Sequence, residues 1–128
     1  ENDNLPDVNL THPNNYRAIR YADVLLMAAE ALNRGGIDDA LARDYLNQVR
    51  ERAGLAPTDA SGSVLLETIY LDRRLELMGE GHRFFDLVRT GRAASFIDGF
   101  QENKNEVFPI PLEEIQFAQG NWEQNTGY

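Results

Sequence analysis

The chain has 128 residues, enough for one domain with a hydrophobic core. Its 42% hydrophobic and 26% charged residues are ordinary for a globular protein. The net charge of −9 and the pI near 4.6 argue against nucleic acid and anionic membranes as partners, and the absence of cysteine excludes disulfides and thiolate metal sites.

The N-terminal half predicts a helical hairpin. Residues 1–15 are polar, lack a hydrophobic period and are expected to form a loop leading into the first helix. A helix is predicted at 16–33, capped by Asn14 or Asn15 and stopped by Gly35-Gly36, because apolar residues repeat at helical spacing: Ala18, Ala22, Leu25, Leu26, Ala29 and Leu32. A second helix is predicted at 39–53, with Asp38 as its cap and a core stripe of Ala42, Leu46, Val49 and Ala53. The short turn between them predicts an antiparallel hairpin of loosely tetratricopeptide-like spacing.

The second half predicts another hairpin and then a tail. A third helix is expected at 64–78, capped by Ser63, with a core stripe of Val64, Leu71, Leu75 and Met78. A fourth is expected at 82–90, with Phe84, Leu87 and Val88 facing the core. Prolines make 107–111 extended, 112–119 has room for one or two helical turns, and 120–128 is a closing loop. The predicted fold class is all-α, with tetratricopeptide-like hairpins and an irregular C-terminal tail.

Charged and apolar residues are interleaved at 72–87, where three interpretations compete. Glu80, His82 and Asp86 are metal-ligand types, but the chain has only two histidines and no HExxH motif. Glu76 and Glu80 have the spacing of a carboxylate pair that a glycan hydrolase would use. However, arginines lie within reach of both, and the sequence lacks a nucleophile elbow, a cysteine and a phosphate-binding loop.

We favour the third interpretation, a structural ion-pair network. Arg73 and Glu76, like Arg83 and Asp86, are three residues apart, so helical neighbours alternate in sign. Guanidiniums and carboxylates that face each other across the glycine corner at 79–81 would fix the angle between the third and fourth helices. The predicted members are Asp72, Arg73, Arg74, Glu76, Glu80, Arg83 and Asp86. We therefore expect no catalytic residue, no metal and no cofactor.

Five segments follow one another along the chain: RYADVLLMAAEALNRGG, LNQVRERAGL, DRRLELMGEGHRFFDLVRTGRA, VFPIPLEEI and QNTGY. Together they resemble the C-terminal region of the SusD/RagB family. The resemblance covers residues 16–128, which we interpret as a SusD/RagB-like C-terminal helical domain. Because the chain does not begin with Met and family members are several hundred residues long, we expect it to be a fragment of a longer protein.

The resemblance implies a function as well as a fold. Members of this family are lipoproteins of the Gram-negative outer membrane, held at the cell surface only by a lipid on an N-terminal cysteine. They bind oligosaccharides or polysaccharides, or sometimes peptides, and deliver them to a SusC-type TonB-dependent transporter without acting as enzymes. In such a protein this chain would be helical scaffold, and most ligand-binding loops would lie upstream of Glu1. The alternative is a free-standing helical-repeat adaptor that binds a protein partner in a hairpin groove.

One residue of the tail is a ligand candidate. Trp122 lies among Asn121, Glu123, Gln124 and Asn125, and an aromatic ring beside amides and carboxylates suits the apolar faces and hydroxyl rim of a sugar. A lone tryptophan in a small domain is more often buried. We therefore expect Trp122 to pack the closing loop onto the helices and leave the ligand site unassigned.

Overall fold

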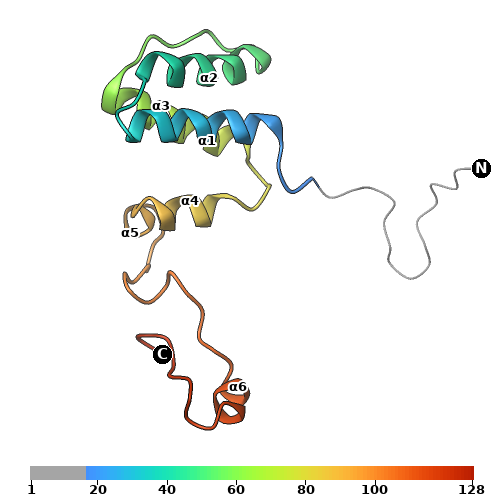
Figure 1. The fold of residues 1–128 in the computed structure, drawn as a ribbon, viewed down its shortest axis with the longest axis vertical. Helices are drawn as coiled ribbons and strands as arrows, with labels where there is room; N and C mark the ends of the chain where they lie inside the picture. The colour runs from blue at the N-terminus through green and yellow to red at the C-terminus, as the bar shows by residue number, and fades with distance from the viewer. Residues whose placement is uncertain (1–16) are drawn as a thin grey trace, which may run out of the picture. The chain divides into compact units, whose positions relative to one another are not determined.

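The computed structural model describes residues 17–128, and within it the chain forms two units, one ending at Glu76 and the other spanning Leu77–Tyr128 (Figure 1). Six helices and no strand occur among the described residues. The prediction of an all-α fold is therefore confirmed. The loop expected at 1–15 and the caps expected at Asn14 and Asn15 lie outside the described residues.

The first unit consists of α1 (Tyr21–Arg34), α2 (Asp39–Arg52) and α3 (Gly62–Glu76). As predicted, α1 and α2 form an antiparallel hairpin, and α3 packs against both (Figure 1). Among the described residues α1 begins at Tyr21 rather than 16, because Arg20 has extended backbone with φ −115° and ψ 157°. Ala18 therefore precedes the helix and is exposed.

The turn between α1 and α2 has the geometry that its sequence predicts. Gly36 has a positive φ of 60°, a conformation that glycine adopts at little cost. Asp38 caps α2, since its side chain accepts a hydrogen bond of 2.9 Å from the backbone N–H of Leu41. Both features of the predicted hairpin turn are confirmed.

A single apolar cluster joins the three helices. Its buried members are Ala22, Leu25, Leu26, Ala29, Ala42, Leu46, Val49, Leu65 and Ile69. The predicted stripes of α1 and α2 are largely confirmed, although Ala53 is exposed.

The predicted stripe of α3 is wrong. Val64, Leu71 and Leu75 are exposed, as is Met78, which lies beyond the end of the helix. The buried face of α3 instead carries Leu65, Ile69, Asp72 and Arg73. Hydrophobicity alone selects the opposite face of α3, because it assigns charged residues to the surface. Ser63 also lies inside the first turn of α3 and not before it.

Asp39 connects the ends of all three helices. Its Oδ1 accepts a hydrogen bond of 2.7 Å from the side-chain amide of Asn33, and its Oδ2 accepts one of 2.5 Å from the backbone N–H of Gly62. The bond from Gly62, followed by that from Asn33, holds the pKa of Asp39 below its ordinary value of 3.8. One carboxylate thereby fixes the end of α1, the start of α2 and the start of α3.

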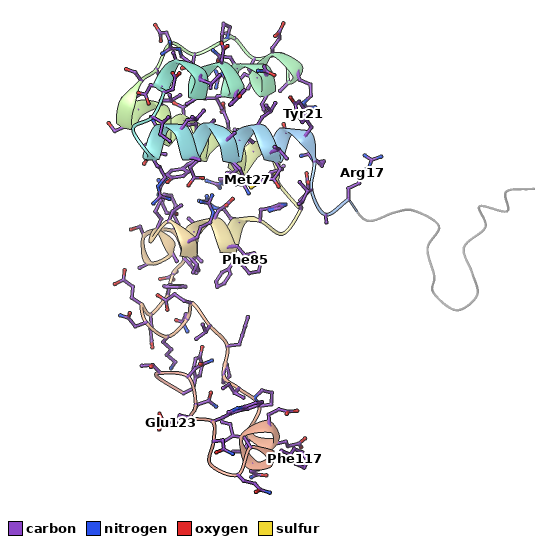
Figure 2. All side chains as sticks on the ribbon, viewed as in Figure 1. Arg17, Tyr21, Met27, Phe85, Phe117 and Glu123 are labelled. Atoms are coloured by element: carbon purple, nitrogen blue, oxygen red, sulfur yellow. The ribbon has the colours of Figure 1, made fainter. Side chains whose placement is uncertain are left out.

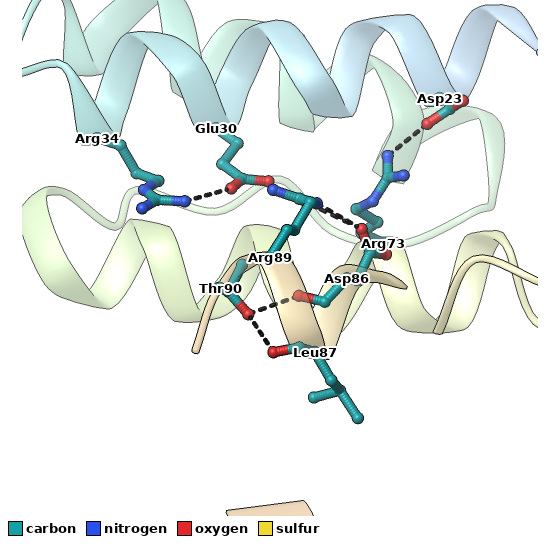
Figure 3. Close-up of polar contacts among 8 residues, drawn as sticks. All are labelled: Asp23, Glu30, Arg34, Arg73, Asp86, Leu87, Arg89 and Thr90. Atoms are coloured by element: carbon teal, nitrogen blue, oxygen red, sulfur yellow. Dashed lines mark hydrogen bonds and ion pairs between the residues drawn. The ribbon is translucent and has the colours of Figure 1, made fainter. Parts of the chain in front are cut away.

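The second unit contains α4 (Arg83–Arg89), α5 (Ala93–Phe96) and α6 (Leu112–Phe117), joined by turns and irregular segments. Leu77, Leu87 and Ala93 are its buried apolar side chains. The last turn of α4 is closed by Thr90, whose hydroxyl donates to the carbonyl of Asp86 at 2.6 Å (Figure 3). The irregular C-terminal tail is as predicted. No helix formed by residues 17–128 has the length and apolar composition needed to cross a membrane.

Candidate functional site

Two charged residues of α3 are buried inside the first unit. Arg73, 5% exposed, donates through Nη1 to Oδ1 of Asp23, which is 3% exposed (Figure 3). Asp72, also buried, accepts through Oδ2 a bond of 2.8 Å from Nη1 of Arg50. These pairs join α3 to α1 and to α2. A buried charge of this kind is tolerated only while its partner is present.

Glu76, the last residue of α3, is held by two arginines. Its Oε1 accepts a bond of 2.9 Å from Nη1 of Arg20, and its Oε2 accepts one from Nη2 of Arg52. Arg20 also donates through Nη2 to the backbone carbonyl of Glu76 at 2.9 Å. That carbonyl is one of those that a helix leaves without an internal partner at its C-terminal end. Arg20 therefore satisfies both the side chain and the backbone of Glu76.

The observed ion pairs differ from those that helical spacing predicts. Expected pairs such as Arg73 with Glu76 run along one helix, whereas Arg73 pairs with Asp23, 50 residues away, and Glu76 with Arg20, 56 residues away. Arg74, beside the buried Arg73, is exposed. The sequence thus identifies a charged block but not the partners of its members.

In the second unit, the predicted network residues also have partners close by. Asp86 pairs with Arg89 at 2.8 Å. The guanidinium of Arg83 lies 5.2 Å from the ring centroid of Phe96, within the range of a cation–π interaction. Glu80 is half-buried and its backbone N–H donates to Leu77. That the seven residues act as one network across both units stays a prediction.

The catalytic and metal interpretations concern Glu76, Glu80, His82 and Asp86. Both carboxylate oxygens of Glu76 accept hydrogen bonds from arginines of other segments, as in a structural ion pair. Within residues 17–128, no group of three or more histidine, cysteine, aspartate or glutamate side chains is placed to hold a metal ion.

A groove lies beside the N-terminal end of α1. It has a volume of about 360 Å³ and is lined by apolar side chains of α1 and α2, with Tyr21 exposed at its edge and Arg20 and Arg52 among its walls. The two arginines are those that hold Glu76. An adaptor would use a hairpin groove of this kind for a protein partner.

The tail of the second unit is closed by a bidentate contact between Gln124 and Ile110. The side-chain oxygen of Gln124 accepts from the N–H of Ile110 at 2.8 Å, and its amide nitrogen donates to the carbonyl of Ile110 at 2.9 Å. Pro109 and Pro111 have no N–H, so Ile110 has the only backbone donor in this triplet. Gln124 therefore bonds both the N–H and the carbonyl of Ile110, the one residue of the triplet that has both groups.

Three further contacts strengthen this closure. Asn125 Nδ2 donates to the carbonyl of Phe108 at 2.6 Å, and the hydroxyl of Tyr128 donates to that of Val107 at 3.0 Å. The ammonium of Lys104 lies 5.1 Å from the centroid of the Tyr128 ring. We call the contacts of Gln124, Asn125 and Tyr128 with residues 107–110 the tail clamp. It joins the sequence segments VFPIP and QNTGY, and α6 lies between these segments in the chain.

A hollow of about 380 Å³ lies beside α6, in the segment between the two halves of the tail clamp. Its walls are formed by Glu114, Phe117, Ala118, Gln119, Asn121 and Trp122. We call it the α6 hollow; its volume lies in the range of small-molecule sites, roughly 300–1,000 Å³. Phe117, which Figure 2 labels on α6, is 80% exposed, and Trp122 is 54% exposed.

The exposure of Trp122 corrects one expectation. The sequence predicts that Trp122 packs the closing loop, but more than half of its surface is accessible. Its neighbours also differ in part from those expected. Asn121 shares the hollow with Trp122, whereas Gln124 and Asn125 belong to the tail clamp. Phe117, Glu114 and Gln119 come from α6 and the turn after it, and only the helical turn predicted at 112–119 could have indicated them.

Comparison with known proteins places this geometry in a family. A model of the SusD family matches residues 4–103. Two SusD-like proteins of Formosa agariphila, P38 and P25, are 42% and 38% identical over 85% and 89% of this chain, and the chain covers 24% of each.

Solved structures agree with this assignment. A laminarin-binding SusD-like protein has a TM-score of 0.80 and 46% identity over 93% of this chain, and the match covers 24% of that protein. A SusD homologue from Bacteroides thetaiotaomicron also has a TM-score of 0.80, with 33% identity over 90% of this chain and 26% of its own. The 128 residues thus span about a quarter of the relatives they match. The chain belongs to the SusD family.

Proposed function

We propose that this chain is the C-terminal helical part of a protein that binds glycan at the surface of a Gram-negative bacterium. The observation that carries the proposal is the likeness to a laminarin-binding SusD-like protein, at 46% identity over 93% of this chain. The two proteins also share a fold, with a TM-score of 0.80. The match covers 24% of that protein, so the parts that bind its ligand need not lie within it.

In this proposal the first unit is scaffold. Its apolar cluster and the buried ion pairs of Asp72 and Arg73 hold the three helices in a fixed arrangement. Upstream loops carry most of the glycan site, and a lipid on an upstream cysteine anchors the protein in the outer membrane. The bound oligosaccharide or polysaccharide passes to a SusC-type TonB-dependent transporter, so the protein takes part in nutrient uptake without cleaving the glycan.

The test uses the full-length natural protein together with the product of any adjacent transporter gene. We expect laminarin or another glycan to bind saturably, to be recovered intact, and the transporter to co-purify with the protein. Recovery of shortened oligosaccharides would contradict the non-enzymatic role. Absence of binding to a broad glycan panel would contradict the proposed function.

The groove beside Tyr21 favours the alternative, an adaptor for a protein partner. The groove is open, and Tyr21 at its edge is 72% exposed. An adaptor would capture a protein partner without glycan, and Tyr21→Ala would abolish this capture. Glycan binding that Tyr21→Ala leaves unchanged is the result that our proposal expects.

A further inference from the structure

The α6 hollow combines the two kinds of group that recognise a sugar. Phe117 and Trp122 expose large aromatic rings, and the same walls carry the carboxylate of Glu114 and the amides of Gln119 and Asn121. The apolar C–H face of a pyranose packs on an aromatic ring, while amides and carboxylates exchange hydrogen bonds with its hydroxyls. An exposed apolar patch that is rimmed by polar residues is typical of a binding site.

Backbone hydrogen bonds hold the walls of the hollow. The N–H of Ala118 donates to Glu114 at 3.0 Å, that of Gln119 to Gln116 at 3.2 Å, and that of Asn121 to Ala118 at 3.0 Å. The two bonds between Gln124 and Ile110 join the ends of the segment that contains the hollow. A site that is ordered before binding loses less conformational entropy when the ligand arrives.

The segment that contains the hollow is acidic. Residues 93–128 contain one cation, Lys104, whose ammonium lies over the ring of Tyr128. The same residues contain six carboxylates: Asp98, Glu102, Glu106, Glu113, Glu114 and Glu123. Glu114 is itself in the wall of the hollow. A sulfated or uronic sugar would therefore meet like charge, whereas a neutral sugar would not.

We propose that the α6 hollow is a subsite for a neutral pyranose ring of the glycan, with Trp122 and Phe117 as its stacking platforms. The inference rests on the proposed glycan-binding function and assigns part of it to this chain. It differs from the scaffold role, because the C-terminal tail then contacts the ligand directly.

The experiment measures the affinity of the full-length protein for laminarin, a neutral glucan, and for alginate, a polymer of uronic acids, by calorimetry. The variants are Trp122→Ala and Phe117→Ala. The matched control is Phe108→Ala, which removes an aromatic side chain that is 83% exposed but is not part of the hollow. Since all three rings are exposed, circular dichroism should show the same helical content in every variant.

We expect Trp122→Ala to weaken laminarin binding by about tenfold or more, Phe117→Ala to weaken it less, and Phe108→Ala to leave it unchanged. Laminarin affinity that both hollow variants retain would overturn the subsite and leave the glycan function intact. Binding of alginate alone would overturn the choice of a neutral sugar. No binding to any glycan would overturn the proposed function and the subsite together. Loss of transporter co-purification, with laminarin affinity intact, would assign the hollow to the transporter instead.

Discussion

In residues 17–76, nine apolar side chains from three helices form one buried cluster, and charged residues of α3 pair beneath the surface with arginine and aspartate of the neighbouring helices. In residues 107–128, by contrast, α6 has no buried residue, and side-chain amides bonded to the backbone hold the segment closed. The first region owes its structure to packing and the second to individual hydrogen bonds. A packed helical unit and an irregular segment with exposed aromatic rings are thus held by different kinds of contact.

Arg73→Ala should have the largest effect and would test the first half of this contrast. It leaves the carboxylate of Asp23, only 3% exposed, without its guanidinium, and we expect the free energy of unfolding to fall. Removing one partner of a buried pair costs about 3–5 kcal/mol. Chemical denaturation followed by far-UV circular dichroism measures the change. The adjacent Arg74→Ala is the control; since Arg74 is exposed, its effect should stay within about 0.5 kcal/mol. If both variants lost the same free energy of unfolding, the buried pair of Arg73 and Asp23 would not be a main source of stability.

Gln124→Ala should have an intermediate effect, confined to the second unit. It removes both bonds to Ile110 and leaves the N–H and carbonyl of that residue without this partner. An unsatisfied buried group costs about 1–3 kcal/mol, and Ile110 is half-buried, so we expect the lower part of that range. Amide hydrogen exchange at Ile110 should accelerate while α1 and α2 remain protected. Gln116→Ala, which changes an exposed residue of α6, is the control. Faster exchange at Ile110 in both variants would show that the bonds from Gln124 are not what protects this amide.

Asp39→Asn should have the smallest effect and a dependence on pH. The pKa of Asp39 is lowered in the folded protein, so its stabilising contribution is complete well above 3.8 and is lost as the pH falls through the folded value. The variant should therefore have a slightly lower Tm than the natural protein at neutral pH, and the difference should shrink in acid. Scanning calorimetry across this range measures it, with the exposed Asp44→Asn as control. A Tm difference that grows as the pH falls would contradict this prediction.

The parts of the fold that were predictable from sequence are those set by local rules. The cap at Asp38, the left-handed Gly36 and the core stripe of α2 depend on residues within one or two helical turns of each other. The buried face of α3 was not predictable in this way, because Asp72 and Arg73 are buried only by virtue of Arg50 and Asp23, which lie 22 and 50 residues away.

The candidate site was predictable only in part. An amide that bonds to backbone leaves no periodic signal, so the pairing of Gln124 with Ile110 could not be read from either segment alone. Trp122 was identified by its type and its polar neighbours, but the choice between packing and exposure depends on what surrounds the loop. Phe117 has the same apolar character as a core residue of a short helix, and only its 80% exposure distinguishes it.

The tail clamp has a consequence for how such proteins diversify. Its members are Gln124, Asn125, Tyr128 and backbone groups of residues 107–110, and none of them lines the α6 hollow. Closure of the loop and the chemistry of its exposed wall are thus encoded by separate residues. We therefore expect substitutions at positions 117, 119, 121 and 122 to change the wall of the hollow while the closing contacts stay the same.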